Sequence, residues 1–255
     1  MEGLDGIVLP GGESTAMGLI GNSSVNPDGK NVWEGLKEFQ SRKPTWGTCA
    51  GMILLAEQCV GASAVIENGQ SLIGGVDILV CRNYFGSQIS SFEMSTPPPP
   101  GQVSKESYPG VFIRAPAILS AGPSVTVLGK VVATPCRQAA VVLQELERKI
   151  ANGEKVIQMV VVDALERKSS QDINYRVVVK PPAAEEDEEK KESNAEESDG
   201  WSSISLPGAA DGSNAREVIC AVRKNNLLCT AFHPELTNDY RWHEYFVKMV
   251  RESMD

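Results

Sequence analysis

Short apolar runs alternate along this chain with longer segments in which apolar residues recur at helical spacing. Runs rich in Ile, Val and Leu that are bounded by Gly, Pro, Asn or Asp are typical of buried strands. They predict strands at 6–9, 45–47, 75–82, 111–114, 125–132, 156–162, 217–222 and 227–232. Helical spacing predicts helices at 14–19, 32–41, 49–58, 138–150 and 239–252. Because strands alternate with helices, we expect an α/β fold with a largely parallel central sheet and helices on both faces.

An acidic segment interrupts this alternation. Residues 183–199 hold nine acidic residues and two lysines, a net charge of −7 in a chain whose total is −9. The segment has no aromatic or branched apolar residue, so we expect residues 183–200 to be disordered. We expect a single domain over residues 1–255 with an insertion at about 136–214. A solvated loop is favoured over a regulatory role for Ser193 or Ser198.

The composition excludes several classes of function. The chain is 42% hydrophobic and can bury a core, but no apolar stretch approaches the ~20 residues of a membrane span. Outside the acidic segment the net charge is only −2 (−9 minus −7), which leaves no basic surface for nucleic acid. The spacing of cysteines and histidines predicts no metal site, and no glycine-rich loop predicts a nucleotide, so we expect no cofactor. Unpatterned cysteines and the lack of an N-terminal signal favour the cytoplasm.

The strongest chemical signal is Gly-Thr-Cys-Ala-Gly at residues 47–51, between a predicted strand and an apolar helix. This spacing is the thiol counterpart of the turn that presents a serine nucleophile between strand and helix. The glycines matter because a side chain at either flank would clash in so tight a turn. A helix N-terminus favours a thiolate at Cys49. The other five cysteines lie in apolar or unremarkable contexts, which indicates structural roles.

One of the two histidines in the chain offers a base for Cys49. If residues 230–235 are extended, His233 and Glu235 point to the same side. The glutamate can then orient the imidazole while the imidazole acts on Cys49. The alternative is a partly buried structural histidine beside a turn proline, which would be preferred without the cysteine turn. His243 lies in the last predicted helix, where a structural role is favoured.

A third motif, Pro-Gly-Gly-Glu-Ser-Thr at residues 10–15, follows the first predicted strand. A glycine-rich loop lets its backbone approach a ligand closely. Gly11 and Gly12 can therefore supply one oxyanion donor, and the N–H of Ala50 can supply the second. The alternative is an ordinary turn with a helix cap at Ser14.

These three motifs, in this order, resemble those of the class I (triad) glutamine amidotransferases, whose fold is flavodoxin-like. Two further segments are similar to the glutaminase subunits of pyridoxal 5′-phosphate synthase. They are Arg-Asn-Tyr-Phe-Gly-Ser-Gln at 82–88 and Gly-Val-Phe-Ile-Arg-Ala-Pro at 110–116, and the ending at 230–243 agrees with them. The resemblance covers about residues 3–135 and 215–251. These segments argue against the γ-glutamyl hydrolases, another Cys-His-Glu class.

The resemblance implies a mechanism and a partner. Cys49 would attack the side-chain amide of L-glutamine, His233 would act as base and then as acid, and Glu235 would orient His233. Gly12 and Ala50 would form the oxyanion hole. Ammonia would pass to a separate pyridoxal 5′-phosphate synthase subunit in a hetero-oligomer.

The resemblance also implies a set of glutamine-binding residues: Gly11, Gly12, Glu13, Ser14, Arg82, Ile113 and Arg114. A guanidinium suits this task because it pairs with a carboxylate through two parallel hydrogen bonds. Without the resemblance, a surface ion pair would be the preferred interpretation of Arg82 and of Arg114.

One departure from the family concerns the first residues. Family members begin with a strand, a turn, a helix and a second strand before Pro-Gly-Gly, whereas here that motif begins at residue 10. We therefore expect the chain to lack the family's N-terminal strand-helix-strand. Two hypotheses follow, an active glutaminase or a truncated, catalytically silent binding or regulatory subunit of the same complex.

Overall fold

The structure is a computed structural model that describes residues 3–23, 25, 29, 31–61, 71–86, 91–152, 206 and 214–254. The predicted strand at 156–162 and the predicted acidic loop at 183–200 lie outside these residues. So do positions 87 and 88 of the family-like segment 82–88, and most of the predicted insertion at 136–214. No helix in the described ranges is long and apolar enough to cross a membrane.

Within the described residues, the central sheet has eight strands. Seven lie in one row, and the eighth, β8 (Thr126–Ala133), pairs with β9. The row runs β1 (Ile7–Leu9), β2 (Thr45–Thr48), β10 (Leu227–Thr230), β9 (Arg216–Lys224), β7 (Ala117–Ala121), β4 (Val76–Cys81) and β3 (Ala56–Val60). The pairs β1–β2, β2–β10 and β3–β4 are parallel, and the others are antiparallel. A separate antiparallel hairpin is formed by β5 (Phe92–Thr96) and β6 (Tyr108–Phe112).

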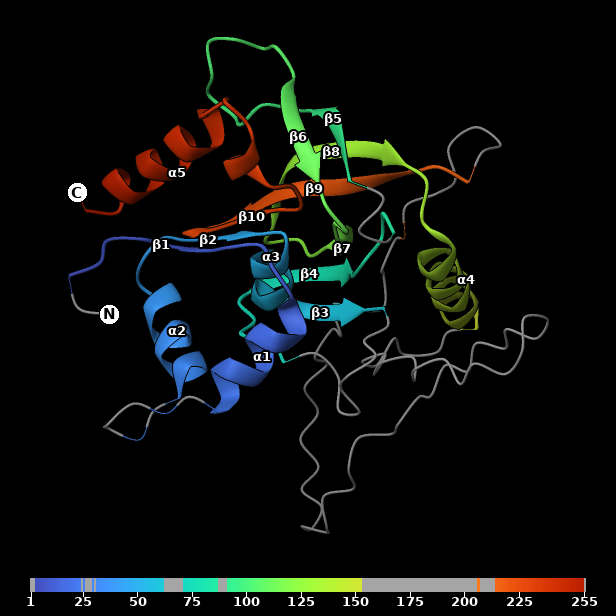
Figure 1. Cartoon of the computed structure of the whole chain (residues 1–255), viewed down its shortest axis with the longest axis horizontal. Helices are drawn as coiled ribbons and strands as arrows, with labels where there is room; N and C mark the ends of the chain where they lie inside the picture. The colour runs from blue at the N-terminus through green and yellow to red at the C-terminus, as the bar shows by residue number, and fades with distance from the viewer. Residues whose placement is uncertain are drawn as a thin grey trace, which may run out of the picture.

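Helices cover both faces of the sheet around β2. The helices are α1 (Ser14–Ser23), α2 (Val32–Gln40), α3 (Ala50–Leu55), α4 (Arg137–Ala151) and α5 (Arg241–Glu252), with a short 3₁₀ helix η1 (Pro234–Leu236). In Figure 1, α5 lies on one side of β1, β2 and β10, and α1–α3 lie on the other. The ring of Trp46 packs on Phe246 of α5, with 5.6 Å between centroids, whereas the next residue, Gly47, faces α3. The predicted α/β fold is therefore confirmed.

Three local predictions were wrong, each because tertiary pairing overrides local pattern. The predicted helix 49–58 ends at Leu55, and Ala56–Val60 turns into strand β3, which pairs with β4. Strands β5 and β7 were missed, because each is short and carries little apolar alternation. Strand β6 begins at Tyr108 instead of the predicted residue 111. Pro109 argues against a central strand, but a hairpin edge tolerates a proline.

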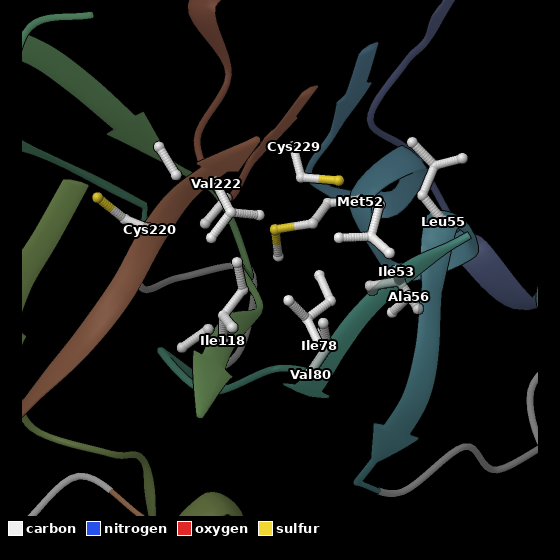
Figure 2. Close-up of a cluster of buried hydrophobic side chains, with 14 of the residues drawn as sticks. Met52, Ile53, Leu55, Ala56, Ile78, Val80, Ile118, Cys220, Val222 and Cys229 are labelled. Atoms are coloured by element: carbon white, nitrogen blue, oxygen red, sulfur yellow. The ribbon is translucent and has the colours of Figure 1, made fainter. Parts of the chain in front are cut away.

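The main core lies between α3 and the middle of the sheet. Figure 2 shows side chains from α3 and from neighbouring strands of the sheet, β4, β7, β9 and β10 among them, gathered in one apolar cluster. They include Met52, Ile78, Ile118, Val222 and Cys229, all fully buried. Because α3 follows directly from Cys49, packing of this helix fixes the position of that cysteine.

Replacing Ile118 by alanine should lower the free energy of unfolding by about 2–5 kcal/mol, because Ile118 is fully buried at the centre of this core. Equilibrium unfolding in urea measures the loss. The matched control is Val132→Ala on β8, a residue that is 55% exposed, and the expected loss there is below about 1 kcal/mol. Similar losses in the two variants would contradict the assignment of Ile118 to the core.

Candidate active site

The backbone turns sharply at Cys49, between β2 and α3. Cys49 has φ 48° and ψ −104°, a region that costs a non-glycine residue of order 1–3 kcal/mol. Its N–H donates to the carbonyl of Thr230, at 2.8 Å. A Cβ atom at Gly47 would lie 2.5 Å from the Gly51 oxygen, and one at Gly51 would lie 2.0 Å from the Leu9 oxygen. This is the strained turn that the glycine spacing predicts.

Three separate parts of the chain meet at one edge of the sheet. Strands β1, β2 and β10 are parallel neighbours, so their carboxyl ends lie together. Leu9 pairs in register with Gly47, and Thr230 pairs with Thr48. The loops that leave these strands carry Gly11, Cys49 and His233.

The imidazole of His233 lies between a thiol and a carboxylate. Its Nδ1 is 2.7 Å from Oε1 of Glu235, which leaves Nε2 as the ring nitrogen available to Cys49. The hydrogen bond with Cys49, and then the hydrogen bond with Glu235, raise the pKa of His233 to about 10 against the effect of burial. An imidazolium at this position is the partner that a thiolate nucleophile requires.

Glu235 reaches His233 by a different route from the one the sequence predicted. Strand β10 ends at Thr230, so residues 230–235 are not one extended segment, and Glu235 lies in η1. A 3₁₀ turn brings the two side chains together in place of strand alternation. Partial burial alone would raise the pKa of the Glu235 carboxyl, but the hydrogen bond with His233, its own backbone N–H and the nearby His243 lower it.

Cys49 differs in its partner from four cysteines that lie in strands of the sheet. Burial raises the pKa of the Cys59 and Cys220 thiols to about 12, and it also raises the pKa of Cys81 and Cys229. At neutral pH these four thiols stay protonated. Of these five cysteines, only Cys49 has an imidazole partner.

The Pro-Gly-Gly loop lies against the His233 ring. A Cβ atom at Gly11 would lie 2.3 Å from Cε1 of His233, so a side chain at position 11 would collide with the imidazole. Gly12 adopts φ 146°, which favours glycine. The carbonyl of Pro10 accepts the N–H of Gly51, at 3.1 Å. Ala50 is the first residue of α3, where an N–H has no acceptor within its own helix.

Glu13 and Arg82 meet beside this loop. The Glu13 carboxylate accepts the N–H groups of Thr15 (3.2 Å) and Ala16 (2.7 Å), and Arg82 Nη2 is 3.6 Å from Glu13 Oε1. Partial burial raises the pKa of the Glu13 carboxyl, but these contacts outweigh it and lower that pKa. Ser14, the first residue of α1, is buried.

Arg82 is not a surface ion pair, because its side chain is only 7% exposed. Its Nη2 donates to the hydroxyl of Thr15, at 2.9 Å. Its Nη1 is buried, and no residue in the described part of the chain accepts from it. A buried guanidinium nitrogen without an acceptor is costly, and an anionic ligand would satisfy it.

Ile113 and Arg114 follow directly from β6. Ile113 is half-buried, and Arg114 is exposed with φ 45°. None of the ion pairs between described residues involves Arg114, whereas Arg82 lies within 3.6 Å of Glu13.

Sequence reasoning missed several contributors to the site. They are Thr15, which binds Arg82, and the backbone carbonyls of Val111 and Thr230, which accept the N–H groups of His233 and Cys49. Thr15 belongs to the Pro-Gly-Gly-Glu-Ser-Thr motif and could have been found there. The carbonyls carry no signal in the sequence. Among the described residues, no three His, Cys, Asp or Glu side chains are grouped to hold a metal ion.

A solved structure described as a glutamine amidotransferase defines the class of fold. It matches with a TM-score of 0.54 and 24% identity, over 98% of this chain and 81% of that one. The family model of the SNO glutamine amidotransferases matches residues 1–144 and 203–252. The chain therefore belongs to the SNO glutamine amidotransferase family.

Curated relatives cover most of the chain. The probable pyridoxal 5′-phosphate synthase subunit PDX2 of Arabidopsis thaliana is 35% identical over 250 residues, which is 96% of this chain and 71% of the relative. The pyridoxal 5′-phosphate synthase subunit PdxT of Carboxydothermus hydrogenoformans is 48% identical over 250 residues, 97% of this chain and 78% of the relative.

The His233 pKa gives a test of the site geometry. Since hydrogen bonds with Cys49 and Glu235 raise this pKa, Cys49→Ala and Glu235→Gln should each lower it from about 10, with the larger drop in Cys49→Ala. The chain has two histidines, so an NMR titration of the imidazole carbons resolves both.

The control for this titration is Glu244→Gln, which removes an exposed carboxylate from α5 and should leave the His233 pKa unchanged. A His233 pKa that stays the same in both site variants would show that the imidazole does not lie between Cys49 and Glu235.

Proposed function

We propose that this chain is the glutaminase subunit of a pyridoxal 5′-phosphate synthase, which hydrolyses L-glutamine to L-glutamate and ammonia. The observation that carries the proposal is the hydrogen-bonded series Cys49–His233–Glu235, which begins at a strained strand-to-helix turn. Membership of the SNO glutamine amidotransferase family and the names of the relatives support it.

In the first half-reaction, the Cys49 thiolate attacks the amide carbon of glutamine and the C=O electrons move to the oxygen. The N–H of Ala50 and the backbone of Gly12 would donate to that oxyanion. His233 then gives its proton to the leaving nitrogen, the C–N bond breaks, and ammonia departs. A γ-glutamyl thioester remains on Cys49.

In the second half-reaction, water attacks the thioester. The now neutral His233 takes a proton from the water, the C–S bond breaks, and glutamate leaves with the Cys49 thiolate restored. Glu235 keeps its bond to Nδ1 throughout, which holds Nε2 toward the reacting atoms and stabilises the imidazolium.

The substrate would be held by groups around the Pro-Gly-Gly loop. Arg82 would pair with the α-carboxylate through its unused Nη1, and Glu13, whose carboxylate is half exposed, would accept from the α-ammonium group. Gly11, Gly12, Ser14, Ile113 and Arg114 complete the proposed set.

The ammonia would pass to a separate synthase subunit, in keeping with the relatives' names. The two would form a hetero-oligomer. We place the complex in the cytoplasm, where a reducing environment keeps Cys49 a free thiol. We retain one domain over residues 1–255 with an insertion at about 136–214 as a proposal. The family model leaves residues 145–202 unmatched, which is compatible with that insertion.

Cys49→Ala should abolish ammonia release from L-glutamine, because no other group can form the thioester. The assay is run with and without a pyridoxal 5′-phosphate synthase subunit. Cys220→Ala, which removes a buried thiol from β9, is the control and should retain activity. Glu235→Gln should cost less than His233→Ala, because it weakens orientation and spares the base.

Two results would overturn this assignment. One is ammonia release by Cys49→Ala at the wild-type rate. The other is a folded wild-type chain that releases no ammonia in either condition, which would support the non-catalytic subunit hypothesis instead.

Arg82→Lys should raise KM for glutamine about tenfold or more with a smaller change in kcat, since one ammonium cannot bind Thr15 and the α-carboxylate from two separate positions as the guanidinium would. Steady-state kinetics measure both constants. Arg223→Lys on β9, at the far end of β10 from His233, is the control and should leave KM unchanged. An unchanged KM in Arg82→Lys would remove Arg82 from the substrate site.

A further inference from the structure

The glutamate that orients His233 lies in a very short helix. Glu235 lies in η1, a helix of three residues, and 48% of its side chain is exposed, whereas that of His233 is 11% exposed. A single 3₁₀ turn has few internal hydrogen bonds, and their geometry is poorer than in an α-helix. Contacts outside η1 are therefore important for the position of Glu235.

The hydroxyl of Thr237 closes this turn. Its Oγ1 is 3.2 Å from the carbonyl oxygen of Pro234 and 3.3 Å from that of Asp239, and it accepts the N–H of Asp239 at 3.3 Å. Because a hydroxyl carries one proton, Thr237 donates to one of these carbonyls. It is then an acceptor for any further hydroxyl group.

That further hydroxyl belongs to Tyr108, at the start of β6. Tyr108 Oη is 2.9 Å from Thr237 Oγ1, across 129 positions of the sequence. Tyr108 is fully buried, and its ring packs on Phe232 and edge-to-face on Trp242. The rotamer of Tyr108 is thus fixed by aromatic neighbours, so its hydroxyl holds Thr237 in one place.

Arg241 also connects the residues before β6 to the residues that follow η1. Its guanidinium pairs with Asp239 and donates to the carbonyl oxygens of Glu106 (2.7 Å) and Ser107 (2.9 Å). It also lies over the Tyr108 ring, 5.8 Å from the centroid. Figure 1 shows the β5–β6 hairpin beside the start of α5, as these contacts require.

The same strand holds the base directly. The N–H of His233 donates to the carbonyl of Val111 in β6, at 2.8 Å. β6 therefore makes two connections to the base and its partner. One is the backbone hydrogen bond to His233, and the other runs from Tyr108 through Thr237 to the turn that carries Glu235.

We propose that Tyr108 is a positioning residue for the catalytic base, acting through its hydrogen bond to Thr237 to keep Glu235 on His233. The inference rests on the proposed glutaminase function for its kinetic consequence. Its geometric consequence, the position of Glu235 against the imidazole, does not depend on that function.

The test is an NMR titration of His233 in the full chain. Loss of the Tyr108 hydroxyl should loosen Glu235 and so lower the His233 pKa by about half a unit or more. Among the described residues, six charged or titratable groups besides His233 itself belong to or lie around the set of His233, Glu235 and Tyr108: Cys49 before α3, Tyr108 in β6, Glu235 in η1, and Asp239, Arg241 and His243 at the start of α5. Tyr108→Phe removes only one hydroxyl from this set and no charge.

The matched control is Tyr245→Phe, which removes a hydroxyl that binds Arg223 near the other end of β10. It should leave the His233 pKa unchanged. In the ammonia assay, Tyr108→Phe should lower kcat about fivefold at unchanged KM, and Tyr245→Phe should change neither constant.

A second pair of variants keeps the test decisive if Tyr108→Phe does not fold. Thr237→Val removes the acceptor and should lower the His233 pKa, whereas Thr237→Ser retains the hydroxyl and should restore it. The double variant Tyr108→Phe, Thr237→Val should show less than the sum of the two single effects, because both act through one bond.

A His233 pKa and kcat that are unchanged in folded Tyr108→Phe would overturn the proposal, as would additive effects in the double variant. If the wild-type chain releases no ammonia, the proposed function fails. In that case the NMR titration alone still decides whether Tyr108 positions Glu235.

Discussion

The parallel pairing of β1, β2 and β10 is the constraint on which the site depends. Parallel neighbours end at the same edge, so residues near positions 10, 49 and 233 meet although the chain separates them by up to some 220 positions. Closing such long loops costs entropy that grows only slowly with their length. Burial of the core around Met52 and Ile118 offsets that cost. The same core anchors α3, and α3 holds Cys49 in a backbone conformation that an isolated peptide would avoid.

Two kinds of interaction, apolar packing and hydrogen bonds, hold the reacting groups in place, and they differ in rigidity. Cys49 stands on the sheet and on a buried helix, so its position follows from packing. His233 is buried but lies beyond the end of β10, and its partner Glu235 lies in a half-exposed turn. Their positions therefore follow from hydrogen bonds that reach across to β6. Preorganisation of the pair therefore joins a dense apolar core to a polar network.

Much of the site was predictable because its signals are local. The glycines around Cys49 are required by close backbone contacts, and the same holds for Gly11, so spacing alone located the turn and the loop. The pairing of His233 with Glu235 was predicted correctly, but the backbone conformation behind the prediction was wrong, since a 3₁₀ turn replaces the expected strand. The roles of Tyr108 and of strand β3 could not be predicted, because they come from partners distant in the sequence. No periodicity within residues 56–60 indicates that β4 lies alongside.

In the proposed glutamine complex, the buried guanidinium of Arg82 would link the occupancy of the site to the stability of the whole fold. Without a ligand, its Nη1 is removed from water and has no acceptor among the described residues. A carboxylate bound to this nitrogen supplies the missing acceptor only in the folded state, so binding shifts the folding equilibrium by mass action. Under the proposed role of Arg82, the melting temperature of the chain would rise with the concentration of the bound amino acid, even for a ligand that is never turned over.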